Sequence, residues 1–120
     1  MPGFELFGAA ERKEVNDVLD SGVLMRYGFD GMRQGHWKAK VLEHAIQSRF
    51  DVNHAQLLSS GTAAVSLALA SSGVGAGDEV IMPCFTFVAS FEAILMLGAI
   101  PVVVDIDDTL TLDANASFKS

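Results

Sequence analysis

From residue 55 onward, short apolar segments alternate with segments of helical character. Such alternation is typical of β-α-β units, in which helical crossovers join parallel strands. The last segment, IPVVVDI at 100–106, is apolar throughout, and a strand of this kind is usually buried on both faces. The sequence therefore predicts an α/β fold with a parallel sheet. Its expected elements are strands at 55–58, 79–82 and 100–106 and helices at 62–71 and 86–97.

The first 54 residues have a different character. They contain two segments of helical periodicity, 11–20 and 37–50, which are joined by a glycine-rich stretch at 22–36 that we expect to be a loop. Residues 1–50 carry seven basic and seven acidic side chains, whereas residues 51–120 carry Lys119 alone against eight acidic ones. We therefore expect an N-terminal helical arm at 1–54 and the first part of an α/β domain at 55–120.

The composition argues against several classes of protein. A net charge of −7 leaves no general basic field for nucleic acid or an anionic membrane. The single cysteine, Cys84, precludes an internal disulfide and fits a reducing compartment, and we expect its thiol to be buried. The N-terminus has no basic, apolar signal segment, which favours a cytoplasmic protein. Glu92 interrupts the apolar segment 85–104 and argues against a membrane span there.

The stretch LLSSGTAAV, residues 57–65, reads as a strand, a turn of small residues and a helix. The first amides of a helix lack intrahelical acceptors and carry the positive end of the helix dipole. Ser60, Gly61 and Thr62 would let an anion approach these amides closely, and a phosphate group is the natural guest. The alternative is that Ser60 only caps the helix. The pattern alone leaves both readings open.

The stretch PCFTFVAS, residues 83–90, leaves the C-terminal end of an expected strand, where open α/β sheets bind their ligands. Phe85 and Phe87 lie two residues apart. If one ring faces the core, the other faces outward and is placed to stack on a flat heterocycle. The alternative is that both rings belong to the core.

A rival reading comes from VVVDIDDTLTLD, residues 102–113. Asp105 and Asp107 follow an apolar strand and fit the DxDxT opening of the haloacid-dehalogenase-type phosphatases, which use Mg²⁺. That motif belongs to the first strand of its fold, whereas here it follows the third expected strand. The remaining alternative is an acidic strand exit. No metal site is otherwise expected, because the three histidines lack the spacing of metal ligands. They are His36, His44 and His54.

Taken in series, the blocks SSGTAAV, GVGAGDEV, PCFTFVAS and GAIPVVVDID resemble the opening of the large domain in the DegT/StrS family. These are sugar aminotransferases that use pyridoxal 5′-phosphate (PLP) and have the aspartate-aminotransferase fold, fold type I. The resemblance implies that Ser60, Gly61 and Thr62 contact the PLP phosphate and that Phe87 stacks on the pyridine ring. It also implies that the lysine forming a Schiff base with PLP lies beyond residue 120, so that no catalytic residue is expected within the chain.

The family resemblance further implies transfer of an amino group, typically from glutamate, to a keto-sugar in surface polysaccharide assembly, such as that of lipopolysaccharide. It implies a homodimer with the site at the interface. The stretch LMRYG resembles a subgroup that aminates 8-keto-3,8-dideoxy-octulosonate, an acidic sugar whose carboxylate Arg26 could bind beside Tyr27. The alternative for Arg26 is a solvated loop side chain. A non-catalytic α/β dimerisation module remains a third alternative for the whole chain.

Overall fold

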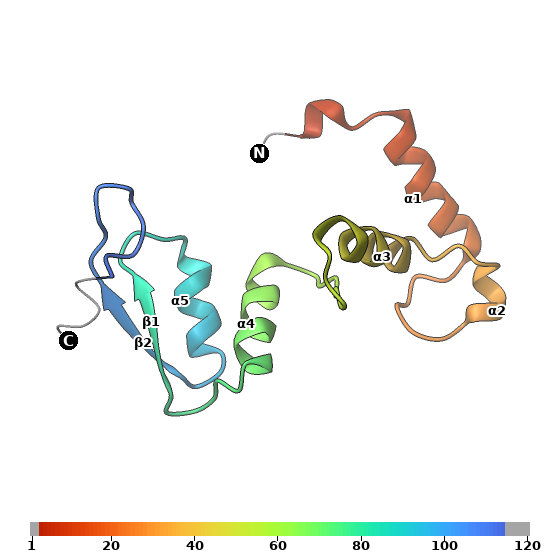
Figure 1. Cartoon of the computed structure of the whole chain (residues 1–120). Helices are drawn as coiled ribbons and strands as arrows, with labels where there is room; N and C mark the ends of the chain where they lie inside the picture. Colours follow the sequence, from red (N-terminus) through yellow and green to blue (C-terminus); the bar gives the residue numbers. More distant parts are fainter. Residues whose placement is uncertain (1–2, 115–120) are drawn as a thin grey trace. The chain divides into compact units, whose positions relative to one another are not determined.

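The computed structural model describes residues 3–114. The chain divides into two compact units, Met1–Leu57 and Leu58–Ser120, and each is described by itself. The division falls close to the change in composition noted above. The elements of unit 1 are η1 (Phe4–Leu6), α1 (Ala9–Ser21), α2 (Asp30–Arg33) and α3 (Lys38–Phe50), and those of unit 2 are α4 (Gly61–Ser71), β1 (Glu79–Pro83), α5 (Val88–Leu95) and β2 (Ile100–Val104) (Figure 1).

Local signals define the ends of α1 in unit 1. The Glu11 carboxylate accepts a hydrogen bond from the Gly8 amide at 2.8 Å, which satisfies a free donor at the start of the helix. At the other end Gly22 adopts a left-handed conformation, φ 68°, and its amide bonds back to Leu19 O. Lys38 at the start of α3 pairs with Glu14 and Asp17 of α1, so that a shared cation joins the two helices.

The sequence predicts a loop at 22–36, but the structure places the single turn of α2 within this stretch. Phe29 before this turn and Gln34 after it both have positive φ, 60° and 49°. Positive φ is uncommon for residues with a side chain and is an outlier for a bulky one. Arg33 at the end of this short helix is buried, and its Nε donates a hydrogen bond back to Gly28 O at 3.1 Å.

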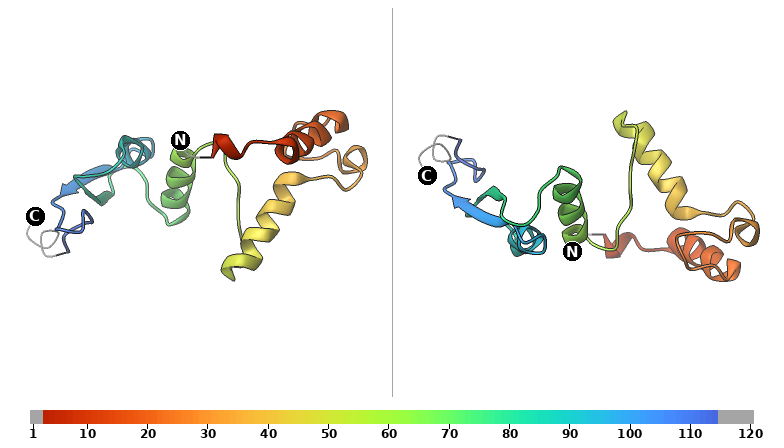
Figure 2. Two further views of the ribbon diagram at one scale, coloured as in Figure 1. Left: turned by 90° about the horizontal axis from the view of Figure 1, so that it is seen from above. Right: turned by 90° about the horizontal axis from the view of Figure 1, so that it is seen from below.

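Unit 2 forms a parallel two-stranded sheet with two helices. β1 and β2 pair in register from Glu79 opposite Ile100 to Pro83 opposite Val104, as expected for a crossover through α5. α5 lies between α4 and the strands (Figures 1 and 2). The core consists of Met82, Ile94 and Ala99, with Leu69, Val74 and Val80 packed against it.

Three expectations for unit 2 are wrong, for related reasons. Residues 55–58 form no strand, because β1 and β2 are the only two strands among residues 3–114 and neither pairs with that segment. β2 is not buried on both faces: Val104 is buried, but Val103 is 53% exposed on the face that α5 does not cover. Cys84 is exposed rather than buried, since it lies just past the end of β1.

The apolar segment 85–104 folds as α5 followed by β2, with a turn at Gly98. Across residues 3–114, no helix has both the length and the apolar character needed to cross a bilayer. Glu92 lies on α5 and is exposed.

Candidate functional site

The turn before α4 is built as an open helix N-terminus. Ser60 is extended, φ −158° and ψ 161°, and is the N-cap residue. Its side-chain oxygen accepts a hydrogen bond from the Ala63 amide at 3.1 Å, and its carbonyl accepts one from the Ala64 amide. Ser60 is therefore a helix cap, as the alternative reading proposed. Capping satisfies the amides of Ala63 and Ala64 but not those of Gly61 and Thr62.

The amides of Gly61 and Thr62 have no acceptor among residues 3–114. Gly61 is exposed, and a Cβ placed on it would meet no atom within 4 Å. An anion can therefore approach these two amides through open space, in the field of the helix dipole. Had the amides pointed into packed protein, the phosphate reading would have failed. The geometry fits a phosphate group.

Phe87 lies at the same end of unit 2 as this turn. It precedes α5 as the N-cap residue and its side chain is 77% exposed, while Phe85 is 62% exposed. Neither ring is packed into the core, so the reading that buries both is wrong. The N-termini of α4 and α5 and the carboxyl ends of β1 and β2 face one side of the unit (Figure 1), which is where sheets of this kind bind ligands.

Arg26 in unit 1 is held by side chains of its own unit rather than being solvated. Its Nη2 lies 2.7 Å from Oε1 of Glu43, which is only 6% exposed, and 3.3 Å from Oε1 of Gln56. The same Glu43 oxygen accepts a hydrogen bond from the Leu57 amide at 2.8 Å. One buried carboxylate thus joins the loop after α1, helix α3 and the end of the unit. Tyr27 beside it is 74% exposed.

The Leu57 amide, and after it the Arg26 guanidinium, lower the pKa of the Glu43 carboxyl below its ordinary value of 4.5. A lowered folded pKa means that ionised Glu43 stabilises the fold fully above that ordinary value, and that this stabilisation is lost as the pH falls through the folded pKa. We expect Glu43→Gln to lower Tm by several degrees at neutral pH and to flatten the acid side of the Tm profile. Thermal melts between about pH 3 and pH 7 test this.

The matched control is Glu79→Gln, which removes an exposed carboxyl that makes no ion pair among residues 3–114. It should leave both the neutral Tm and the acid profile close to those of the wild type. An acid profile of Glu43→Gln that superimposes on the wild-type profile would contradict the assigned role of Glu43.

The acidic stretch after β2 folds as a turn. The Asp107 carboxylate accepts hydrogen bonds from Thr109 Oγ1 at 2.5 Å and from its amide at 2.8 Å, and these bonds lower the pKa of Asp107. The Asp105 carbonyl accepts a bond from the Asp113 amide. Within residues 3–114 no group of three His, Cys, Asp or Glu side chains is placed to hold a metal ion. The carboxylate of Asp107 thus fixes the local backbone, as an acidic strand exit would.

The parallel β-α-β unit, with a helix N-terminus beside its carboxyl edge, is similar to the corresponding part of solved aminotransferases of fold type I. The model of the DegT/DnrJ/EryC1/StrS aminotransferase family matches residues 6–117. The chain belongs to that family. This confirms the resemblance read from the sequence blocks, and it overturns the phosphatase alternative for Asp105 and Asp107.

Individual relatives agree with this assignment. The chain is 53% identical over 107 residues to an L-glutamine:2-deoxy-scyllo-inosose aminotransferase of Streptomyces kanamyceticus. This match covers 85% of the chain and 24% of the relative. It is 39% identical over 97 residues to the GDP-perosamine synthase of Vibrio cholerae, covering 81% and 24%. A Streptococcus pneumoniae protein assigned as a sugar aminotransferase, solved in its PLP form, matches with TM-score 0.78 and 38% identity over 92% of the chain and 26% of that protein.

The chain therefore spans about a quarter of the length of the curated relatives it matches. Sequence reasoning singled out Ser60, Gly61, Thr62 and Phe87 at one end of unit 2, and their contacts with a cofactor stay a prediction. It missed Glu43 altogether. The only sequence signal for Glu43 is a carboxylate next to the apolar face of an expected helix, and this signal does not reveal burial.

Proposed function

We propose that the full-length protein carrying this chain is a PLP-dependent aminotransferase that converts a keto group of a sugar into an amino group. One observation carries the proposal: the amides of Gly61 and Thr62 have no acceptor within residues 3–114, and Gly61 is exposed at the N-terminus of α4. Membership of an aminotransferase family supports it, as does the likeness to a protein solved in a PLP form.

The residues of this chain would bind and orient the cofactor. The two amides would donate hydrogen bonds to its phosphate, with the Ser60 and Thr62 hydroxyls beside them, and Phe87 would lie against its ring. Bound PLP supplies the electron sink that lets an amino group pass between a donor and a keto-sugar. The Ser60 oxygen accepts a hydrogen bond from the Ala63 amide, and its O–H group remains free to donate a hydrogen bond to the phosphate.

The finer features of the proposal concern substrates and setting. We propose glutamate as the amino donor and either a nucleotide-linked keto-sugar or 8-keto-3,8-dideoxy-octulosonate as the acceptor. GDP-perosamine synthase and the inosose aminotransferase, by their names, serve a nucleotide-linked sugar and a cyclitol ketone, so keto-carbohydrates are the shared substrate class. We further propose a cytoplasmic homodimer that acts in the biosynthesis of lipopolysaccharide or a related surface polysaccharide.

The test uses the full-length protein purified with PLP and then desalted. Retention of about one PLP per chain is expected, together with glutamate-dependent amination of keto-sugars followed by mass spectrometry. A protein that retains no PLP would refute the proposal and favour the non-catalytic dimerisation module. PLP retention with alanine or glutamine as the only effective donor would refute the choice of glutamate alone.

Phe87→Ala should weaken PLP binding by about tenfold, the size expected when a stacked aromatic ring is lost. Phe85→Ala is the matched control, because its ring is also exposed and lies two residues away. We expect this control to change PLP affinity little. Equilibrium dialysis against PLP measures both. Equal losses in the two variants would show that the segment is destabilised as a whole and that Phe87 has no specific role.

A further inference from the structure

A cavity of about 360 Å³ lies in unit 1 beside the only tryptophan of the chain, Trp37. A volume of this order is enough for a small-molecule ligand. The charged and aromatic groups that line the cavity come from α2, from the turn after it and from the first half of α3. They are Asp30, Arg33, Trp37, Lys40 and His44.

Arg33 is the most unusual of these residues. Its side chain is buried, with the residue only 6% exposed, and its guanidinium carbon lies 4.7 Å from the centre of the Trp37 ring. Nε donates to Gly28 O at 3.1 Å, but Nη2 is buried without any acceptor among residues 3–114. A buried guanidinium nitrogen without a partner is costly, because water no longer solvates it. No carboxylate of residues 3–114 lies within ion-pair distance of Arg33, so its buried positive charge favours an anion nearby.

Lys40 adds a second unpaired cation. Its Nζ lies 5.1 Å from the centre of the same Trp37 ring, and no carboxylate of residues 3–114 lies within ion-pair distance of it. Among residues 3–114, Asp30 is the one carboxylate that lines the cavity. Arg33 and Lys40 therefore outweigh it and leave a local positive charge in a chain whose net charge is −7. Positive charge converging on an aromatic wall favours an oxyanion attached to an organic body.

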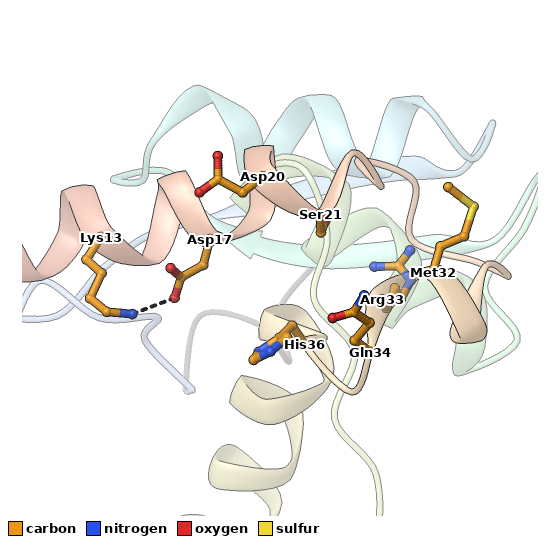
Figure 3. Close-up of a pocket in the computed structure, with 8 residues that line it drawn as sticks. All are labelled: Lys13, Asp17, Asp20, Ser21, Met32, Arg33, Gln34 and His36. Atoms are coloured by element: carbon orange, nitrogen blue, oxygen red, sulfur yellow. Dashed lines mark hydrogen bonds and ion pairs between the residues drawn. The ribbon is translucent and has the colours of Figure 1, made fainter.

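A neighbouring cavity, which Arg33 also lines, differs in charge. It contains Asp17 and Asp20, and Lys13 there is already paired with Asp17 at 2.8 Å (Figure 3). Its cations are balanced by carboxylates, so an anion gains little from entering it. Asp17 is also bonded to Lys38. Arg33 thus lines two cavities. In the one with Lys13 and Asp17 the charges are balanced, whereas in the one beside Trp37 the positive charges outnumber the carboxylates.

We propose that the cavity beside Trp37 binds the carboxylate or phosphate group of a sugar-sized ligand. The exposed Lys40 Nζ binds the oxyanion, the positive charge of the buried Arg33 guanidinium attracts it, and the Trp37 ring lies beside the body of the ligand. This goes beyond the proposed function, because it concerns unit 1 alone and requires no PLP. A carboxylate and a phosphate share the required chemistry, and the two probes below distinguish them.

The experiment titrates the full-length, PLP-saturated protein with glucuronate, glucose 1-phosphate and uncharged glucose at constant ionic strength. Saturable heat in titration calorimetry is expected for at least one charged probe and not for glucose. A matching change in tryptophan fluorescence is expected, and it should disappear in Trp37→Phe. The charged probe with the lower Kd identifies the preferred oxyanion. Binding of glucose equal to that of both charged probes, or no saturable binding of either, would overturn the proposal.

Variants locate the site. Arg33→Gln should raise the Kd of the preferred probe by about tenfold, as expected when a buried positive charge close to the anion is removed. Because Arg33 is buried and its variant could unfold, Lys40→Glu provides a second test at an exposed position, and it should abolish binding while circular dichroism stays unchanged. Lys13→Gln in the neighbouring cavity is the control and should bind as the wild type does. Unchanged affinity in Lys40→Glu would overturn the proposal.

The result can be separated from that of the proposed function. PLP retention of Lys40→Glu should equal that of the wild type, because unit 2 carries the proposed cofactor residues. A glucose 1-phosphate signal that is lost in Gly61→Val but kept in Lys40→Glu would place the phosphate at the α4 turn and refute the cavity. Loss of PLP binding in the wild type, with the glucuronate signal intact, would refute the proposed function alone.

Discussion

Gly61→Val is expected to lower PLP affinity by about a hundredfold or more, the equivalent of about 2.7 kcal/mol. The new side chain would occupy the open space beside the Gly61 and Thr62 amides, which is the path by which an anion reaches them. The fold should survive, because φ at Gly61 is not positive and a Cβ there meets no atom within 4 Å. Equilibrium dialysis of the full-length protein against PLP measures the loss.

Gly75→Val is the matched control for this substitution. Gly75 also lies in unit 2, has no positive φ, and would place a Cβ in open space, but it belongs to the turn between α4 and β1. It should retain PLP as the wild type does. If both variants lose PLP to the same degree, or if Gly61→Val keeps wild-type affinity, the phosphate does not lie against the first two amides of α4.

The parts of the fold that the sequence predicted correctly depend on neighbours along the chain. Ser60 caps α4, one of the two readings that the sequence offered, because its side chain reaches an amide three residues on. The helical segment expected at 11–20 ends as α1 at the start of the glycine-rich stretch, where Gly22 adopts a left-handed conformation without strain. The parallel pairing of β1 with β2 was also predictable, since a helix between two apolar strand segments is the usual crossover of a parallel pair. Each of these signals lies within one segment or one connection.

The incorrect predictions depend on groups that are distant in sequence. Residues 55–58 have the composition of a strand, but a strand exists only when another strand bonds to it. The apolar run in β2 predicted burial on both faces, yet Val103 is exposed because only one face of the two-stranded sheet is covered by α5. Periodicity and composition measure what a segment could bury and not what is present to cover it.

The site residues show the same division. Gly61 and Phe87 could be proposed from the sequence because small residues before a helix and an aromatic residue after a strand are local signals, and their contacts with a cofactor stay a prediction. Glu43 and Arg33 were not, since the role of each comes from burial and from partners far along the chain: Arg26 and Leu57 for one, Trp37 for the other. A charged residue in a helix is usually solvated, so its sequence carries no sign that it is buried.

Ile94→Ala should lower the free energy of unfolding by about 2–5 kcal/mol, the range for truncating a buried aliphatic side chain to alanine. Ile94 is 3% exposed and packs with Met82 and Ala99, so the substitution leaves a cavity between α5 and the sheet. Leu95→Ala on the same helix is the control and should cost less than about 1 kcal/mol, because Leu95 is 49% exposed. Urea unfolding followed by circular dichroism measures both. Equal losses would mean that the exposed face of α5 is as tightly packed in solution as its buried face, and a core centred on Ile94 would then be wrong.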